Sequence, residues 1–265
     1  MTTLSYMVFA PCPCLAGKYM LFKPLPVAEE VRLSEQKTGP REAVVLLSGG
    51  MDSATCLAVA CSEGLSCHAL TIDYGQRHHR ELQAAAGIAA SLGASEHLVM
   101  RVELDRVGGS ALTGDMPVPR RPAEGIPVTY VPARNLVFLS LAVAWAEVLG
   151  ARAVYIGVNQ VDYSGYPDCR GEFLEAFRQA ARAGTRAGSE GRQIEIRAPL
   201  LDLDKPGIIR LGSRLGVDFA LTHTCYDPDS AGRACGRCPA CRLRLEGFRR
   251  AGLSDPAPYQ PGGRE

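Results

Sequence analysis

The chain has 265 residues, of which 46% are hydrophobic and 22% are charged, and its formal net charge is +1. This near-neutral balance argues against a broad positive surface for nucleic acid or for an anionic membrane. No apolar run approaches the roughly 18 residues that a membrane-spanning helix requires. The apolar patch at residues 4–10 follows no basic residue and is interrupted by Pro11 and Pro13, unlike a secretory signal. We therefore expect a cytoplasmic protein that binds neither membrane nor nucleic acid.

Residues 1–40 carry five prolines and no sustained hydrophobic period, so we expect an irregular N-terminal extension. From Arg41 onward, short apolar runs alternate with helical patterns. In chain order, these patterns predict strand 43–47, helix 54–61, strand 68–73, helix 78–92, strand 96–102, helix 133–149, strand 154–158, helix 173–183, strand 194–198, helix 206–215 and helix 243–250. Residues 105–131 are rich in glycine and proline, which predicts a long surface loop near the active site.

Alternation of apolar strands with helices predicts an α/β fold with a doubly wound, mainly parallel, Rossmann-like sheet. Such sheets bind ligands at the carboxyl ends of their strands, where the strand order switches. Candidate binding residues should therefore follow the expected strands.

The segment 48–53 (SGGMDS) lies between the first expected strand and the first expected helix. Its glycines let backbone amides approach a phosphate, and the helix N-terminus adds partial positive charge. The hydroxyls of Ser48 and Ser53 add donors, while Asp52 suits the magnesium ion that accompanies nucleotide phosphates. A Walker loop and a dinucleotide fingerprint are both absent. We favour a phosphate-binding loop over the alternative, an ordinary Gly-Gly turn with a Ser or Asp helix cap.

Four of the ten cysteines fall within 17 residues, namely Cys225, Cys235, Cys238 and Cys241. Such clustering differs from the spread pairs of a disulfide framework in a small secreted protein. Four thiolates suit tetrahedral zinc, and because all four positions are filled, the site is expected to be structural. An iron–sulfur cluster is the rival assignment. Buried unligated thiols are a further alternative, which the neighbouring arginines disfavour.

The hexapeptide SGGMDS resembles the signature of the PP-loop ATP-pyrophosphatase superfamily, which moves AMP from ATP onto a substrate oxygen. Further segments extend the resemblance to the 7-cyano-7-deazaguanine synthase family of queuosine biosynthesis. The matching segments are 46–56 (LLSGGMDSATC), 73–77 (DYGQR), 131–136 (VPARNL), 157–170 (GVNQVDYSGYPDCR), 197–205 (RAPLLDLDK) and 234–248 (ACGRCPACRLRLEGF). The tract SGYPDCR is the most specific, because related tRNA-thiolating enzymes lack it. Residues 1–42 have no counterpart in the resemblance.

The resemblance implies a carbon–nitrogen ligase that converts 7-carboxy-7-deazaguanine and ammonia into 7-cyano-7-deazaguanine through adenylated acid and amide intermediates. It implies ATP, Mg²⁺ and one Zn²⁺ per chain, a homodimer, and an adenine nucleotide alpha hydrolase-like fold. Residues 41–220 would form the ATP-binding domain, and residues 221–265 a zinc-binding segment packed on it. The alternatives are a PP-loop tRNA-thiolating or other adenylating enzyme, and a relative that attaches deazaguanine to another nucleophile. A non-enzymatic zinc-ribbon module would leave the phosphate loop unexplained.

The resemblance also assigns site residues. ATP is expected at Leu46, Leu47, Ser48, Gly49, Gly50, Met51, Asp52, Ser53, Ala54, Thr55 and Cys56. Catalytic roles are expected for Ser48, Asp52, Ser53 and Arg134, and substrate contacts for Arg134, Asn135, Asp162, Tyr163, Tyr166 and Asp168. Arg134 could pair with a carboxylate or phosphate, one of the two aspartates could accept from the guanine-like edge, and a tyrosine could stack on the ring. His78, His79 and Lys205 could contact phosphate, but each is equally well interpreted as a surface residue at a helix start.

Overall fold

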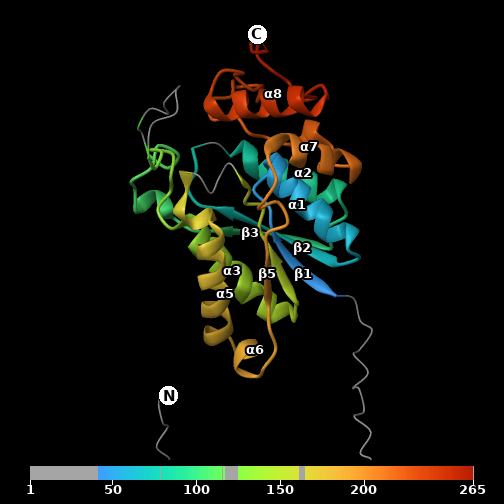
Figure 1. Ribbon diagram of the computed structural model, residues 1–265. Coiled ribbons are helices and arrows are strands. Elements are labelled where there is room, and N and C mark those ends of the chain that lie inside the picture. Colours follow the sequence, from blue (N-terminus) through green and yellow to red (C-terminus); the bar gives the residue numbers. More distant parts are fainter. Residues whose placement is uncertain (1–40, 78, 115, 117–124, 161–164, 265) are drawn as a thin grey trace, which may run out of the picture. The chain divides into compact units, whose positions relative to one another are not determined.

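A computed structural model describes residues 41–77, 79–114, 116, 125–160 and 165–264 (Figure 1). The expected N-terminal extension, residues 1–40, lies outside the described residues. The described part contains a five-stranded sheet with helices on both faces, which confirms the predicted doubly wound α/β fold. None of the helices in this part is long and apolar enough to cross a membrane.

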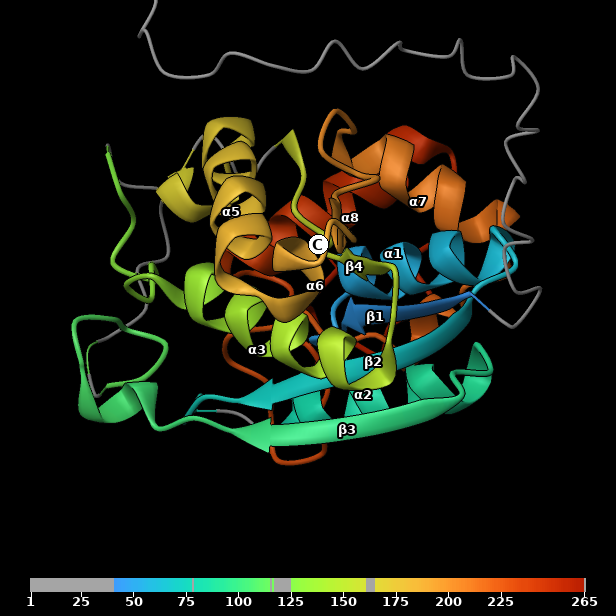
Figure 2. The same cartoon turned by 90° about the horizontal axis from the view of Figure 1, so that it is seen from below.

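Every neighbouring pair of strands in the sheet is parallel, and the strand order is β3-β2-β1-β4-β5. The strands are β1 Glu42–Leu46, β2 Ser66–Asp73, β3 Glu96–Arg101, β4 Ala153–Tyr155 and β5 Glu195–Arg197. Figure 2 shows β1, β2 and β3 side by side in this order. Strands are added in one direction from β1 to β3 and in the other through β4 to β5, so the order switches between β1 and β4. The carboxyl ends of β1 and β4 are therefore where a ligand is expected.

The helices cover both faces because β1 is apolar on both faces, as expected of a central parallel strand. The helices are α1 Met51–Ser62, α2 Arg80–Ser91, α3 Arg134–Leu149, α5 Gly171–Gly184, α6 Arg186–Ser189, α7 Lys205–Arg214 and α8 Pro239–Ala251. Ala43 and Val45 belong to the apolar cluster formed with α1, α2, α7 and α8, whereas Val44 and Leu46 belong to the cluster formed with α3, α5 and α6. Figure 1 shows α3 and α5 on one side of the sheet and α1, α2 and α7 on the other.

The strand predicted at 154–158 is shorter than expected. β4 ends at Tyr155, although the apolar run continues to residue 158 and stays buried apart from its glycine. A buried apolar run need not pair as a strand, because it can also line a pocket. Gly157 lies against the backbone of Asp52 and Ser53, which a Cβ atom at this position would approach to 3.1 Å. The chain therefore leaves the sheet here and runs beside the segment that follows β1.

Two helices, α1 and α8, begin about a full turn earlier than predicted. α1 begins at Met51 rather than at residue 54, so the second half of SGGMDS forms the first helical turn. α8 begins at Pro239 rather than at residue 243, and Cys238 is its N-cap, with Sγ accepting a hydrogen bond from Cys241 N at 3.4 Å. The predictions depended on an apolar period, which the first turn of both helices lacks. The first turn of α1 contains residues of the phosphate loop, and that of α8 contains Cys241 of the cysteine cluster.

α8 is fixed to α7 by close packing, and a buried ion pair joins α8 to the segment that follows it. A Cβ atom on Gly247 of α8 would lie 2.9 Å from Ile209 Cδ1, so the two helices approach closely. Arg244 donates from Nε and Nη2 to the Asp255 carboxylate at 2.8 and 2.9 Å. Burial opposes ionisation of Asp255, but hydrogen bonding to Arg244 keeps the pKa of this carboxyl below its ordinary value.

Candidate active site

The phosphate loop, residues 48–53, is held by hydrogen bonds among its own residues. Ser48 N donates to Ser53 Oγ at 3.1 Å, and the two hydroxyl oxygens lie 3.0 Å apart. Gly49 has a φ of +87°, and a Cβ atom there would clash with the Glu81 carbonyl oxygen in the first turn of α2. Glycine at position 49 therefore permits the left-handed turn and the direct packing of α2 on the loop.

The N-terminus of α1 follows the loop without a side-chain cap. Its N-cap residue is Gly50, which has no side chain to bind the first amides of the helix. These amides lack intrahelical partners, and the helix N-terminus carries partial positive charge. The loop and the helix terminus together form a site suited to phosphate groups.

Asp52 lies in the first turn of α1 and presents two different carboxylate oxygens. Its Oδ2 accepts hydrogen bonds from Lys205 Nζ at 2.5 Å and from Asn159 Nδ2 at 3.3 Å. Its Oδ1 is buried and has no hydrogen-bond partner among the described residues. A buried carboxylate oxygen left without a donor is costly. Such an oxygen is a suitable ligand for a hard cation such as Mg²⁺. The residues present therefore fit the magnesium ion expected from the sequence.

Lys205 begins α7, as the sequence suggested, but its surroundings are not those of a surface residue. Only 12% of its side chain is exposed, and its ammonium group forms an ion pair with Asp52. The sequence could not distinguish these two environments, because α7 and the phosphate loop are about 150 residues apart in the chain. The structure brings the positive charge of Lys205 to the carboxylate of the phosphate loop.

A cavity of about 270 Å³ joins the phosphate loop to the ends of β2 and β4 and to the start of α3. Its polar and aromatic lining comes from five separate segments. These residues include Ser48, Asp52, Ser53, Tyr74, Gln76, Glu81, Thr129, Arg134, Asn135, Phe138, Tyr166, His223, Thr224 and Tyr226. A concave site with a few convergent polar groups is the usual form of a small-molecule binding site.

Arg134, which begins α3, lies in this cavity beside two aromatic rings. Its guanidinium carbon is 5.8 Å from the ring centroid of Tyr74 and 6.0 Å from that of Phe138. The preceding residue, Ala133, has a left-handed φ of 54° and donates its N–H to Tyr130 Oη at 3.0 Å. The structure thus places the predicted cation where it can contact a ligand that also occupies the phosphate loop.

Asn135 and Asp168 were predicted to contact substrate, and the structure brings them together. Asp168 Oδ2 accepts from Asn135 N at 2.8 Å, so this carboxylate binds an amide in the first turn of α3. Asn135 Nδ2 donates to Asp168 O at 3.1 Å and to Cys169 Sγ at 3.1 Å. Asn135 lines the cavity, whereas Asp168 does not. These contacts give both residues a role in fixing the start of α3 and therefore the position of Arg134.

Tyr166 lines the cavity, and its hydroxyl is hydrogen-bonded to Thr129 Oγ1 at 3.0 Å. Its ring stacks on Tyr130 with centroids 6.0 Å apart. The other two residues predicted in this tract, Asp162 and Tyr163, lie outside the described residues, as does His78. His79, the other histidine that the sequence suggested as a phosphate contact, is the exposed N-cap of α2 and does not line the cavity.

The predicted nucleotide-binding run is only partly exposed to the cavity. The lining members are Leu46, Leu47, Ser48, Gly50, Asp52 and Ser53. Ala54, Thr55 and Cys56 are fully buried in α1, where Thr55 Oγ1 donates to Met51 O at 2.9 Å. These three residues would support the helix that carries the anion-binding amides.

Several cavity residues were not singled out from the sequence. Tyr74 and Gln76 belong to the matching segment DYGQR, but their roles could not be assigned. Glu81 lay in the predicted helix 78–92 and Tyr226 beside Cys225, and neither was given a functional role. Burial raises the pKa of the Glu81 carboxyl to about 7, although the charge of Arg134 opposes this rise. The only sequence signal for Glu81 was its position just after a quoted segment.

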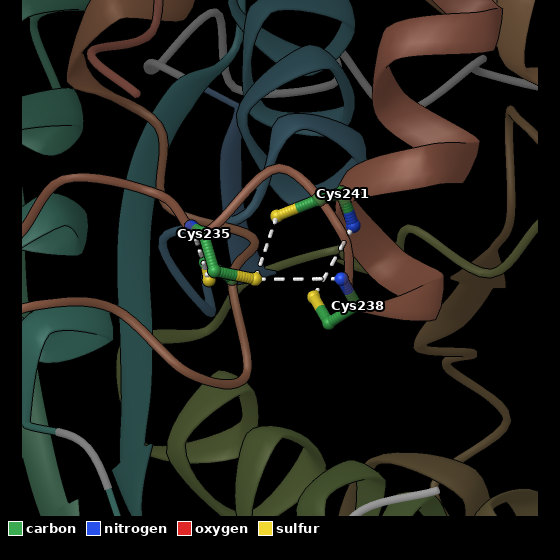
Figure 3. A group of neighbouring side chains, drawn as sticks. Cys235, Cys238 and Cys241 are labelled. Atoms are coloured by element: carbon green, nitrogen blue, oxygen red, sulfur yellow. Dashed lines mark hydrogen bonds between the residues drawn. The ribbon is translucent and has the colours of Figure 1, made fainter. Parts of the chain in front are cut away.

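The four predicted metal ligands converge in one buried cluster (Figure 3). The sulfurs of Cys225, Cys235, Cys238 and Cys241 all lie within 4.8 Å of one another. Tetrahedral zinc with bonds of about 2.3 Å would separate its sulfur ligands by about 3.8 Å, so a small contraction would complete the site. Backbone N–H groups donate to three of the sulfurs, as in the bonds from Cys235 to Cys225 at 3.2 Å and from Cys238 to Cys235 at 3.3 Å.

The thiols of the cluster compete for protons because they are so close. Hydrogen bonds from Cys225 and Cys241 lower the pKa of Cys238, and the same contacts raise the pKa values of the two donors. None of the eight described cysteines forms a disulfide. Four thiolates can share such a space only with a cation between them, so this donor set fits a metal ion.

The chain is similar to known proteins over most of its length, including both motifs. The family model described as Queuosine biosynthesis protein QueC matches residues 42–252, which include the phosphate loop and the four cysteines. A 7-cyano-7-deazaguanine synthase from Thiobacillus denitrificans is 63% identical over 218 residues, covering 82% of this chain and 97% of that protein. A protein of the same name from Pseudomonas savastanoi pv. phaseolicola is 58% identical over 228 residues, which cover 86% of this chain and 100% of that protein. Another from Aromatoleum aromaticum is 60% identical over 225 residues, which cover 84% of this chain and 100% of that protein.

Proposed function

The chain belongs to the family of queuosine biosynthesis protein QueC, and we propose that it converts 7-carboxy-7-deazaguanine and ammonia into 7-cyano-7-deazaguanine at the expense of ATP. The observation that carries this proposal is one cavity that contains the phosphate loop, the cation Arg134 and several aromatic rings. Such a cavity can hold a nucleotide beside a flat heterocycle that bears a carboxylate. A cytoplasmic location and a homodimer remain predictions from the sequence.

The chemistry requires two activations of oxygen. A carboxylate has no leaving group, so AMP is first transferred to its oxygen and pyrophosphate departs. Ammonia then attacks the acyl carbon, AMP leaves, and an amide forms. A second ATP adenylates the amide oxygen, and loss of AMP with the two amide protons leaves the nitrile. The protein has to position the reactants and stabilise charge, which is within the capacity of the residues present.

We assign the nucleotide phosphates to the phosphate loop. The hydroxyls of Ser48 and Ser53 and the first amides of α1 would donate to phosphate oxygens. Asp52 Oδ1, which is buried without a donor, would bind Mg²⁺. The ion would neutralise charge on the phosphates when bound. Lys205 orients Asp52 through the other carboxylate oxygen.

We assign the heterocycle to the part of the cavity near α3. Arg134 would pair with the substrate carboxylate, and Tyr166 offers an aromatic face. Asn135 would fix the start of α3. The acceptor for the guanine-like edge is proposed to be Asp162 or Asp168, of which Asp168 also accepts a hydrogen bond from the α3 amide. Tyr163 is proposed, like Tyr166, to contact the substrate.

The cysteine cluster is assigned one structural Zn²⁺ per chain. All four ligands are cysteine, which leaves no position for a catalytic water. His223, Thr224 and Tyr226 adjoin Cys225 and line the cavity. Zinc would therefore act on the reaction only by holding this wall in place.

The test is a product assay with the purified protein, ATP, ammonium and the carboxy-deazaguanine. We expect two AMP and two pyrophosphate molecules for each nitrile formed. Substituting RNA for the heterocycle tests the thiolase-type alternative, which requires pyrophosphate release that depends on RNA. Formation of ADP, or release of pyrophosphate only with RNA, would overturn the proposal.

A further inference from the structure

A second, smaller cavity adjoins the active-site cavity and is wide enough for one small molecule. Its volume is about 30 Å³, above the 10–15 Å³ or so that one water molecule needs. Tyr74, Gln76, Glu81 and Tyr226 line both cavities, so they form the boundary between them. A molecule in the small cavity would lie next to the ligand in the large one.

Glu81 is the one carboxylate on this boundary, and within the described part of the chain it forms no hydrogen bond or ion pair. It is partly buried in the first turn of α2, and the packing of its carbonyl oxygen on Gly49 fixes that turn beside the phosphate loop. A carboxylate held near two tyrosine rings and without a donor suits a small cation. Burial of such a group without a partner is otherwise costly.

The two arginine side chains near Glu81 have other partners, shown or proposed. Arg77 lines the small cavity, but its Nη1 donates to Met116 O at 3.1 Å. Arg134 acts on Glu81 electrostatically, and the proposed function assigns it to the substrate carboxylate. Cys225, which also lines the small cavity, would be a zinc ligand.

We propose that the small cavity is the ammonium site of the enzyme, with Glu81 as the carboxylate that binds the ion and accepts one of its protons. This inference rests on the proposed function. The rings of Tyr74 and Tyr226 can contribute cation–π attraction, and Gln76 Oε1, which accepts from Tyr74 N at 2.8 Å, has a second lone pair to offer. Binding of a cation here would compensate the buried charge of Glu81.

The proton transfer makes ammonia available where it is consumed. Ammonium has no free electron pair, so it must lose a proton before it can attack. One N–H bond breaks, its proton goes to a Glu81 oxygen, and the released pair forms the bond to the acyl carbon. The C–O bond to AMP then breaks, AMP leaves with that electron pair, and a second proton passes from nitrogen to solvent. Glu81, with a pKa of about 7, is matched to accepting a proton at neutral pH.

The two halves of the reaction provide the test, because only the first consumes ammonia. In Glu81→Gln, the apparent KM for ammonium in amide formation from the acid should rise roughly tenfold to a hundredfold, as expected when a charged hydrogen bond is lost. Conversion of the amide to the nitrile, assayed without ammonium, should stay within about twofold of wild type. ATP–pyrophosphate exchange with the acid alone should also be retained. Glu81→Asp, which keeps the charge, should recover part of the ammonium affinity.

Gln83→Ala is the matched control, since Gln83 is exposed on the same helix. It should behave as wild type in all three assays. An unchanged ammonium KM in Glu81→Gln would overturn the inference. An equal loss with acid and amide would also overturn it, because Glu81 would then bind the heterocycle or support the fold. Failure of wild type to exchange pyrophosphate with the acid would instead refute the proposed function.

Discussion

The phosphate loop and the cysteine segment, residues 222–241, both contribute to one cavity but are held in place by different means. The loop lies between β1 and α1, whose apolar side chains are buried in the main core, and the hydrogen bonds among the loop's own residues span at most five positions. The buried cluster of the cysteine segment consists of the four thiols and Ala240. A hydrogen bond from His223 N to Gly49 O at 2.9 Å links the two regions. Hydrophobic burial therefore positions the loop, whereas the proposed metal would help to hold the cysteine segment.

The largest effect should follow from breaking the metal site. Cys235→Ser or Cys238→Ser should remove the one zinc per chain and lower the melting temperature, because zinc binding to four thiolates is worth on the order of 10 kcal/mol. Tyr226 and His223 would lose their support, so pyrophosphate release should fall as well. Metal analysis and calorimetry measure both effects. Cys61→Ser, at a partly exposed position away from the cluster, is the control and should keep its zinc. Iron with inorganic sulfide, or a protein without metal, would refute the zinc assignment.

A change in the phosphate loop should separate activity from stability. Asp52→Ala or Ser48→Ala should abolish pyrophosphate release, since loss of one preorganised electrostatic contact costs about 10²–10³ in rate and these residues serve one site together. Zinc content should be unchanged and the melting temperature nearly so, because neither side chain belongs to the apolar core. Lys205→Met should have a smaller effect on rate, since it acts through Asp52. Wild-type turnover in Asp52→Ala would exclude the magnesium role of this carboxylate.

The same contrast explains what the sequence could predict. β1, the phosphate loop and α1 are adjacent in the chain, so apolar pattern, glycines and hydroxyls indicate both structure and chemistry. The four cysteines were predictable because thiols within 17 residues have few other purposes. Local signals sufficed in both cases.

The rest of the cavity depends on contacts between distant segments, which no local pattern encodes. Glu81 reaches the cavity because α2 packs on Gly49, and Lys205 because α7 packs beside α1. Asp168 has a contact that the sequence did not indicate, since its carboxylate accepts a hydrogen bond from the first turn of α3. A residue's partners decide between a surface, a structural and a catalytic role.

The smallest effect is expected from removing the N-terminal extension. A chain that begins near Thr38 should retain its melting temperature within about 1 °C and its turnover within about twofold. Residues 1–40 carry five prolines and no apolar period, so few stabilising contacts should depend on them. The relative from Pseudomonas savastanoi pv. phaseolicola supports this expectation, because its whole length is matched by 86% of this chain. Both regions that form the cavity are retained in the shortened chain. A loss of solubility or of zinc on truncation would show that the extension covers an apolar surface. The extension would then support the cavity together with the hydrophobic core and the proposed metal.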